Sequence, residues 1–399
     1  MLNVLRKSVG PTVLALLLAG SAAPSASAAM PARSKVLSQT VSFLSSELAA
    51  YQGPLGPFAH GVWESTNNIC WACNNGGPAT AAATVYTLSG SSRTDMLSAA
   101  EQTINTAIST RQQPSGQFTP PAGDTQPSGI ATIFFGLEFG TVYHQLAAVL
   151  DQATRARWQS SLAAAADYLA RTGNLTWYSN GNINLSEITF FWLVWQATGN
   201  TKYERDYNSL WKFTLHPPQN EFPGSGLVVV KAPTKADGSD GMGYLTETGA
   251  GGTGFDASYT STQLDNLCRL YLLSRDPRVL YLANLEINML LPRINSSFVL
   301  NISSGTRHTE ANAQAGIMTS SFAVLGLVGG RTDLASKILP YLNVLESWYN
   351  VSGQADTPVY RRGLATDVSM IALAAGSKGG KAPVAKAPRR IRTQRKHAR

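Results

Sequence analysis

One glycine-rich stretch of this 399-residue sequence carries most of the side chains that could do chemistry. It runs from Pro223 to Ser258 and contains nine glycines and four carboxylates, with no helical period. So much glycine loses extra entropy on ordering and adds little apolar area. A loop of this length in a compact helical chain is usually functional or disordered. Acids and aromatic residues interrupt this one, which favours a function.

The carboxylates predict one kind of chemistry. Hydrolysis of a glycosidic bond needs one carboxylic acid to protonate the leaving oxygen and one carboxylate as base or nucleophile. Asp256 is the first choice for the ionised partner, because it closely precedes a helix whose N-terminal dipole favours an anion. Glu247 is the choice for the acid, with Glu310 and Asp240 as alternatives. Asp256 also has a plainer role as a turn cap, and Asp237-Gly-Ser-Asp240-Gly is equally a turn or cation-binding sequence.

A second chemistry, β-elimination, uses other side chains. It needs a Tyr or His to remove the proton α to a uronate carboxylate, and an Asn or Arg to neutralise that carboxylate. The residues that could fill these roles are Tyr259, His308, Arg307 and Asn74. The sequence therefore offers both a carboxylate pair and a Tyr/His/Arg set.

Tyr259 also has a structural interpretation. Thr260 and Gln263 have the spacing of a capping box, which predicts a helix that starts after Thr260. Tyr259 would then precede the cap and pack on Leu264 as a hydrophobic staple. This interpretation competes with a catalytic role.

Aromatic rings and amides accompany the titratable groups. Flat apolar rings beside polar groups suit a sugar, whose CH faces stack while its hydroxyls need directed hydrogen bonds. The predicted substrate-binding residues are Asn74, Asn75, Trp71, Trp177, Tyr244, Asp240 and Arg307. The alternative is that large loops bury aromatic residues simply to hold themselves in place.

The elements that must position these residues are helices. Apolar residues at helical spacing predict about twelve of them, and no convincing alternating strand series is present. The first contains Leu37 to Leu48, and the others fall near 79–89, 94–110, 130–149, 152–171, 186–198, 202–215, 261–274, 277–291, 313–328, 333–348 and 365–376.

The connections between the helices alternate in length. The short ones carry clear signals, such as the stop glycine Gly199 and the N-cap and N1 pair Asp276-Pro277. The long ones cover 52–78, 111–129, 172–185, 216–260, 292–312 and 349–364. Antiparallel helices joined in this way place all long loops at one end. Five helical hairpins follow, and the first and last helices would pair as a sixth to close a ring. An open α-solenoid is the alternative.

At this point the chain resembles the (α/α)6-toroid carbohydrate-active enzymes, which include six-hairpin glycosidases and toroidal polysaccharide lyases. The resemblance rests on Ala197-Thr-Gly-Asn-Thr-Lys-Tyr203, Leu273-Ser-Arg-Asp-Pro-Arg-Val-Leu280 and Phe255-Asp-Ala-Ser-Tyr-Thr-Ser-Thr-Gln263. It implies an all-α (α/α)6 toroid with a substrate cleft over the face that carries the long loops. Toroidal lyases often place a histidine shortly before the tyrosine of the last segment, whereas this chain has no histidine between His216 and His308.

The chain ends differ from its middle. Residues 1–28 resemble an export signal, with Arg6 and Lys7 before a short apolar run and a small-residue cleavage site. Residues 29–376 are the expected toroid, and 377–399 form a basic tail of disordered composition. The tail holds nine Lys and Arg and the signal two; without these eleven, the formal charge of +8 becomes −3. We therefore expect no nucleic-acid binding.

These features predict a secreted protein without a membrane span. Its tail would either tether it to a cell-wall polyanion or simply solubilise it. The pair Cys70 and Cys73 is expected to form a small disulfide loop or to be buried. No metal or organic cofactor is required, although Asp237 to Asp240 leaves calcium open.

The expected function is that of a monomeric, secreted glycoside hydrolase with paired carboxylates that degrades a polysaccharide. Two alternatives remain open. One is a polysaccharide lyase that uses Tyr259 and His308. The other is a non-catalytic cell-wall carbohydrate-binding protein.

Overall fold

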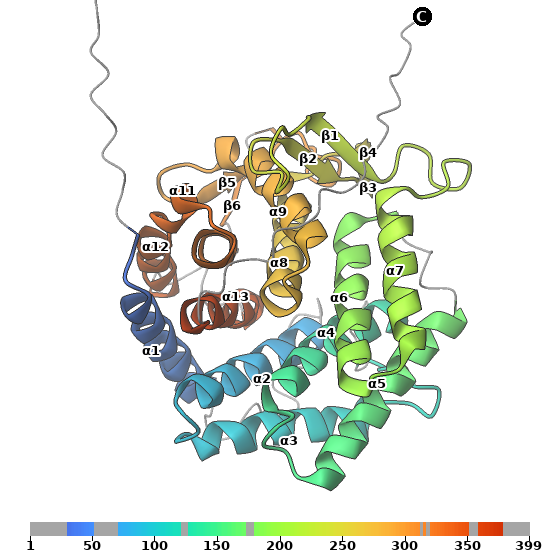
Figure 1. The fold of residues 1–399 in the computed structure, drawn as a ribbon, viewed down its shortest axis with the longest axis vertical. Helices are drawn as coiled ribbons and strands as arrows, with labels where there is room; N and C mark the ends of the chain where they lie inside the picture. Colours follow the sequence, from blue (N-terminus) through green and yellow to red (C-terminus); the bar gives the residue numbers. More distant parts are fainter. Residues whose placement is uncertain are drawn as a thin grey trace, which may run out of the picture.

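The computed structural model describes residues 30–51, 71–120, 127–172, 179–311, 314–316, 320–350 and 358–377. In this part the chain is a double ring of helices (Figure 1). The helices on the inside of the ring are α2 (Trp71–Leu88), α4 (Ser128–Leu146), α6 (Gly181–Thr198), α8 (Ala257–Ser274), α10 (Ser321–Ala323) with the π-helical η3 (Val324–Val328), and α13 (Pro358–Gly376). Those outside are α1 (Arg33–Tyr51), α3 (Thr94–Arg111), α5 (Gln152–Thr172), α7 (Thr201–Leu215), α9 (Pro277–Leu290), α11 (Thr332–Ala335) and α12 (Ile338–Asn350).

Each inner helix packs on the next one around the ring. α13 contacts α2, α2 contacts α4, α4 contacts α6, and α6 contacts α8. The ring is closed by η3, which contacts both α8 and α13. The sixth pair is made by the first and last long helices, because α1 packs along α13. Arg33 at the start of α1 donates hydrogen bonds to the carbonyl oxygens of Ala374 and Ser377 at the end of α13, each at 2.9 Å. It also donates to the carbonyl oxygen of Leu327 in η3. The predicted all-α (α/α)6 toroid is confirmed.

Helix composition matches position in the ring. The inner helix α6 is buried from Gly181 to Val194, because it contacts α4 and α8 within the ring and α5 and α7 outside it. A helix buried on all sides presents no face to water. The outer helix α7 buries only one stripe, which includes Tyr203, Tyr207 and Trp211. This is the pattern expected of a helix with one face in water.

The short connections follow the predicted signals. Gly199 ends α6 with φ 67°, a left-handed conformation that glycine adopts without strain. Asp276 caps α9, and its carboxylate accepts the Arg278 N–H at 2.8 Å, with Pro277 as the first helical residue. Such caps allow the chain to reverse within a few residues.

Several helix limits differ from the sequence-based expectation. α2 begins at Trp71 instead of 79, and it has Pro78 in its interior. α6 begins at Gly181 instead of 186, so the polar residues near its start are helical. The stretch 313–328 was expected to be one helix, but it contains strand β6 (Gln314–Gly316) before α10 and η3.

Six short strands lie within the long connections. They form three two-stranded antiparallel sheets: β1 (Leu227–Lys231) with β2 (Met242–Leu245), β3 (Glu247–Gly249) with β4 (Gly252–Gly254), and β5 (Val299–Asn301) with β6. These segments lack a clear alternating pattern, because β1 contains three consecutive valines and β3 and β4 are rich in glycine.

Three long connections meet at one end of the ring. Gly181 N–H donates to Thr246 O at 3.1 Å, which joins the start of α6 to the connection before α8. Thr306 N–H donates to Phe255 O at 3.2 Å, and Gly251 N–H to Thr306 O at 2.9 Å, which bring in the connection after α9. The inner helices α6 and α8 therefore begin beneath a layer made by these loops.

Candidate active site

Asp256 is the residue around which this layer is organised. It caps α8, and its Oδ1 accepts the Tyr259 N–H at 3.1 Å. Its Oδ2 accepts the backbone N–H groups of Arg307 at 2.8 Å and His308 at 3.1 Å. A helix N-terminus and directed N–H groups favour a negative charge at this position. The carboxylate is fully buried.

His308 is held by the same carboxylate. Its Nδ1 lies 3.3 Å from both Asp256 oxygens. If Nδ1 carries the proton, the other ring nitrogen, Nε2, is left as an acceptor on the side away from Asp256. Gly305 permits this close approach, because a Cβ atom there would lie 2.4 Å from Asp256 Oδ2.

Tyr259 lies beside His308, with ring centroids 6.1 Å apart. Arg307 stacks on the Tyr259 ring, with its guanidinium carbon 4.6 Å from the ring centroid. Its Nη2 donates to the Tyr259 hydroxyl at 3.2 Å, and its Nη1 donates to Thr248 O at 2.8 Å. The sequence lacked a histidine shortly before Tyr259, and the fold supplies one from a different connection.

Glu247 is buried behind this group. Its Oε1 accepts the Asn182 N–H at 2.8 Å and the Gln263 side-chain N–H at 2.7 Å. Its Oε2 has no hydrogen-bond partner among the described residues. Burial raises the pKa of Glu247 from 4.5 to about 7, although these two hydrogen bonds and the charge of Arg307 act in the opposite direction. Glu247 is therefore suited to hold a proton near neutral pH.

The side chains of the candidate site divide by depth. Asp256 and Glu247 are both 0% exposed. His308 keeps 30% of its side chain exposed, Tyr259 is half-buried and Arg307 is exposed. A ligand on the surface therefore meets the histidine, tyrosine and arginine before either carboxylate.

The alternative structural role predicted for Tyr259 is wrong. α8 begins at Ala257, so Thr260 is within the first turn and cannot be its N-cap. Asp256 is the cap instead, as its own plainer interpretation proposed. The capping-box pattern misled because Thr260 and Gln263 have the right spacing but Asp256, four residues earlier, makes the bonds to backbone N–H.

Asp240, another predicted residue, belongs to a separate turn. Asp240 accepts backbone N–H bonds from Thr234 and Lys235 and so closes a turn. This turn packs on α9, where Asn288 donates to Ser239 O and Gly241 O. Its hydrogen bonds, above all the one from the Thr234 hydroxyl, lower the pKa of Asp240 to about 2.

Glu310 and Tyr244 have different surroundings again. Glu310 is exposed, two residues beyond His308. Tyr244 is on β2, with its ring centroid 5.1 Å from that of Phe255, and burial raises its pKa. Asn182, Asn184 and Glu187 are all buried within α6.

Some predicted residues fall outside the described part of the chain. Trp177 and Cys70 do so completely. The backbones of Trp71, Cys73, Asn74 and Asn75 belong to α2, but their side chains are outside the description. The proposed cysteine pairing and the proposed role of Asn74 therefore stay predictions.

Several contributors to the site were not predicted. Gln263 was read only as a capping residue, although it is one turn of α8 beyond Tyr259 and binds Glu247. Asn180 accepts the Thr248 N–H at 3.1 Å and ties the start of α6 to β3. The sequence could have indicated Gln263, because a polar residue in the buried stripe of a helix needs a partner.

No group of three or more metal-ligating side chains is present in the described residues. Asp237 and Asp240, where calcium was left open, therefore do not belong to such a group among the described residues. None of the helices in the described ranges is long and apolar enough to cross a membrane.

The comparisons with known proteins agree with this architecture. A family model described as the ulvan lyase N-terminal domain matches residues 81–221, which cover the C-terminal part of α2 and all of α3 to α7. The matched stretch ends before Glu247, so it does not include the candidate site. No curated protein matches the chain.

Among solved structures, a β-1,3-1,4-glucanase from Paenibacillus sp. X4 superimposes with a TM-score of 0.52 at 12% identity, covering 88% of this chain and 96% of that one. A family 76 glycoside hydrolase (mannosidase) from Bacteroides thetaiotaomicron gives 0.47 at 12% identity, with 85% and 98% covered. An unsaturated glucuronyl hydrolase specific for heparin gives 0.47 at 10% identity, with 85% and 96% covered.

At these identities the glucanase shows a shared fold alone, and the two lower scores add nothing further. Together with the family-model match, the fold confirms the resemblance to (α/α)6-toroid carbohydrate-active enzymes. The class of reaction is not defined by these similarities.

Proposed function

We propose that the protein is a polysaccharide lyase that cleaves a uronate-containing polysaccharide by β-elimination. The observation that carries the proposal is the division by depth: the side chains open to a ligand are those of His308, Tyr259 and Arg307, whereas Asp256 and Glu247 are fully buried. The match to the ulvan lyase N-terminal domain supports it and makes ulvan the first substrate to test.

In the proposed reaction His308 Nε2 removes the proton on the carbon next to the uronate carboxylate. The electron pair of that C–H bond forms the C4–C5 double bond, and the C4–O bond breaks. The Tyr259 hydroxyl gives its proton to the leaving oxygen. Arg307 places a positive charge at the Tyr259 oxygen, where it can offset charge that develops on the uronate or on the phenol.

Asp256 has a positioning role in this proposal. It fixes the His308 ring through Nδ1 and the loop through the Arg307 and His308 N–H groups. A carboxylate that orients an imidazole also stabilises the cation formed when the imidazole accepts a proton.

A second candidate is the glycoside hydrolase first expected from the sequence. The observation in its favour is Glu247, whose pKa of about 7 is that of a general acid at neutral pH. Its burial argues against it, because Glu247 and Asp256 would both have to become accessible before either could touch a sugar.

We expect His308→Ala and Tyr259→Phe each to lower kcat/KM on the polysaccharide by about 10²–10⁴-fold, the usual loss when a proton-transfer group is removed. The measurement is the rise in ultraviolet absorbance from the new double bond. His216→Gln at the exposed end of α7 and Tyr281→Phe on α9 are matched controls and should keep full activity.

Glu247→Gln separates the two candidates. A lyase keeps its activity in this variant within a few-fold, whereas a hydrolase with Glu247 as its acid loses nearly all of it. New reducing ends without ultraviolet absorbance would contradict the lyase. Polysaccharide binding without either signal would instead support a non-catalytic carbohydrate-binding protein.

A further inference from the structure

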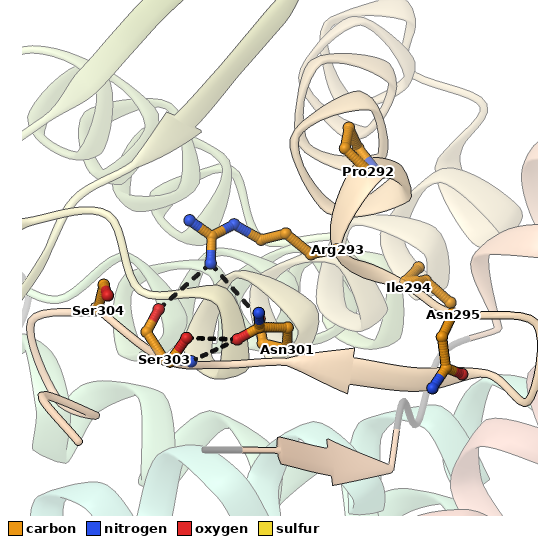
Figure 2. Close-up of a pocket in the computed structure, with 7 residues that line it drawn as sticks. All are labelled: Pro292, Arg293, Ile294, Asn295, Asn301, Ser303 and Ser304. Atoms are coloured by element: carbon orange, nitrogen blue, oxygen red, sulfur yellow. Dashed lines mark hydrogen bonds between the residues drawn. The ribbon is translucent and has the colours of Figure 1, made fainter. Parts of the chain in front are cut away.

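A surface depression of about 450 Å³ lies beside the candidate site and takes no part in the proposed reaction (Figure 2). It is formed where the helical turn η2 (Leu291–Arg293), which follows α9, meets the segment after β5. Arg293, Asn295, Asn301, Ser303 and Ser304 line it together with Pro292 and Ile294. Most of the lining residues are polar, and the one charged side chain among them is an arginine.

Arg293 is held in place from two sides. Its Nη1 donates to Asn301 O at 3.5 Å and to Ser303 O at 3.3 Å, as Figure 2 shows. Its guanidinium carbon stacks 5.0 Å from the Phe255 ring centroid. These contacts orient the guanidinium, and among the described residues they engage one of its three nitrogens. The side chain stays half-buried.

The charge of Arg293 is not balanced locally. It forms no ion pair with any carboxylate in the described residues, and no Asp or Glu lines the depression. Other arginines of the described chain, such as Arg93, Arg269 and Arg278, pair with a carboxylate at 2.7 Å or less. A guanidinium that is oriented but unpaired is suited to bind an oxyanion.

The depression is linked directly to the candidate site. Phe255, on which Arg293 stacks, immediately precedes Asp256, and Ser304 immediately precedes the Gly305 that packs on Asp256. Arg307 stacks on Tyr259 in the same way, 4.6 Å from its ring centroid. The segment from Phe255 to Tyr259 thus carries one stacked arginine near each end.

We propose that the depression is a second anion subsite, in which Arg293 binds a carboxylate or sulfate group on a sugar near the one that is cleaved. This inference rests on the proposed function for its substrate class, a polyanionic polysaccharide. Arg293 would then determine specificity for charged over neutral chains, and it would not touch the reacting atoms.

The test is a binding measurement on the full chain in a His308→Ala background, with and without Arg293→Ala. Three probes separate the sources of charge: polygalacturonate offers carboxylates only, dextran sulfate offers sulfates only, and dextran offers neither. We expect Arg293→Ala to raise the Kd for at least one polyanion about tenfold, the effect of losing a charge-assisted hydrogen bond. Binding of dextran should not change.

Arg157→Ala is the matched control, because it removes one exposed positive charge from the outer helix α5. It should change the same Kd values by less than about twofold, because distant exposed charges are screened by salt. Arg293→Lys keeps the charge and a stem over Phe255 but loses the planar fork, and we expect an intermediate Kd. If Arg293→Ala unfolds at a lower temperature than its parent, Arg293→Lys replaces it in the binding measurement.

The inference is overturned if Arg293→Ala binds both polyanions as its parent does, or if Arg157→Ala weakens them equally. This failure is separate from a failure of the proposed function. The lyase proposal fails when no ultraviolet-absorbing product forms, whatever Arg293 does. An enzyme that forms the product while Arg293→Ala leaves binding unchanged refutes only the subsite.

Discussion

Glu247 illustrates what burial does to a single carboxyl group. Its Oε1 accepts two hydrogen bonds, whereas its Oε2 has no partner in the described part of the chain, so Oε2 is the oxygen that can carry the proton of the neutral form. Glu286 on the neighbouring helix α9 is also fully buried, and burial raises its pKa well above 4.5. Burial thus raises the pKa of two neighbouring carboxyl groups, Glu247 to about 7 and Glu286 in the same direction.

A pH dependence of stability follows from Glu247. The unfolded chain releases this proton near pH 4.5, and the folded protein releases it near 7. The raised pKa therefore favours the folded state at low pH, and this advantage is lost as the pH rises through 7. The free energy of unfolding should fall by about 3 kcal/mol on this account.

Denaturant unfolding at a series of pH values measures the effect. Glu247→Gln should reduce the fall between pH 4.5 and 7 by the share of Glu247, about 3 kcal/mol, since glutamine does not titrate; other buried carboxyl groups such as Glu286 keep theirs. Glu221→Gln, an exposed control, should leave the fall unchanged. An unaltered slope in Glu247→Gln would show that Glu247 is ionised in the folded protein at lower pH.

At the residue scale the sequence pointed to side chains that the structure brings into one region, but it did not indicate how deeply each is buried. Asp256, Glu247, Tyr259, Arg307 and His308 were all proposed, and the structure brings them into one region. Their types and their places in long connections were visible in the sequence. That both carboxylates would be fully buried was not, because burial depends on which loops fold over them.

At the scale of elements, the inner helices are joined by a buried ion pair. Arg269 on α8 contacts Glu138 on α4 at 2.7 Å, and Glu138 also accepts the Thr80 hydroxyl from α2 at 2.6 Å. Gly76 on α2 gives Glu138 its space, since a Cβ atom there would lie 2.3 Å from that side chain. Three helices of the inner ring thus share one set of polar contacts.

Breaking this pair should destabilise the ring. Arg269→Met leaves Glu138 charged and unpaired in the interior, which typically costs about 3–5 kcal/mol. The double variant Glu138→Leu with Arg269→Met removes both charges and should recover most of that loss. Denaturant unfolding of the single and double variants measures both effects. A double variant as unstable as the sum of its single variants would contradict the role given to the pair.

Helices were predictable because their signals are local, whereas the loops were not. Periodic apolar residues and caps such as Asp276 place most helices within a few residues of their observed limits. The short strands depend on partners in distant segments, as in the pairing of β5 with β6. The contact between His308 and Asp256 also spans 52 residues, so no local pattern announces it.

At the scale of the whole molecule, alternating connection lengths predicted a closed ring. The contact of α1 with α13 confirms the closure, and the connections before α6, α8 and α10 meet at one end. This ring is the feature shared with the glucanase of the same fold. Because toroids of this kind serve different reactions, fold alone does not fix the chemistry.

The most direct test of the proposed lyase is the mass of its products. We would digest an oligosaccharide of defined length and uronate content with the wild-type chain and analyse the fragments by mass spectrometry. β-Elimination divides the substrate without adding atoms, so the two fragment masses should sum to that of the substrate, and one fragment should carry the double bond. Fragments whose masses sum to the substrate plus one water would contradict the account and show that the enzyme is a hydrolase.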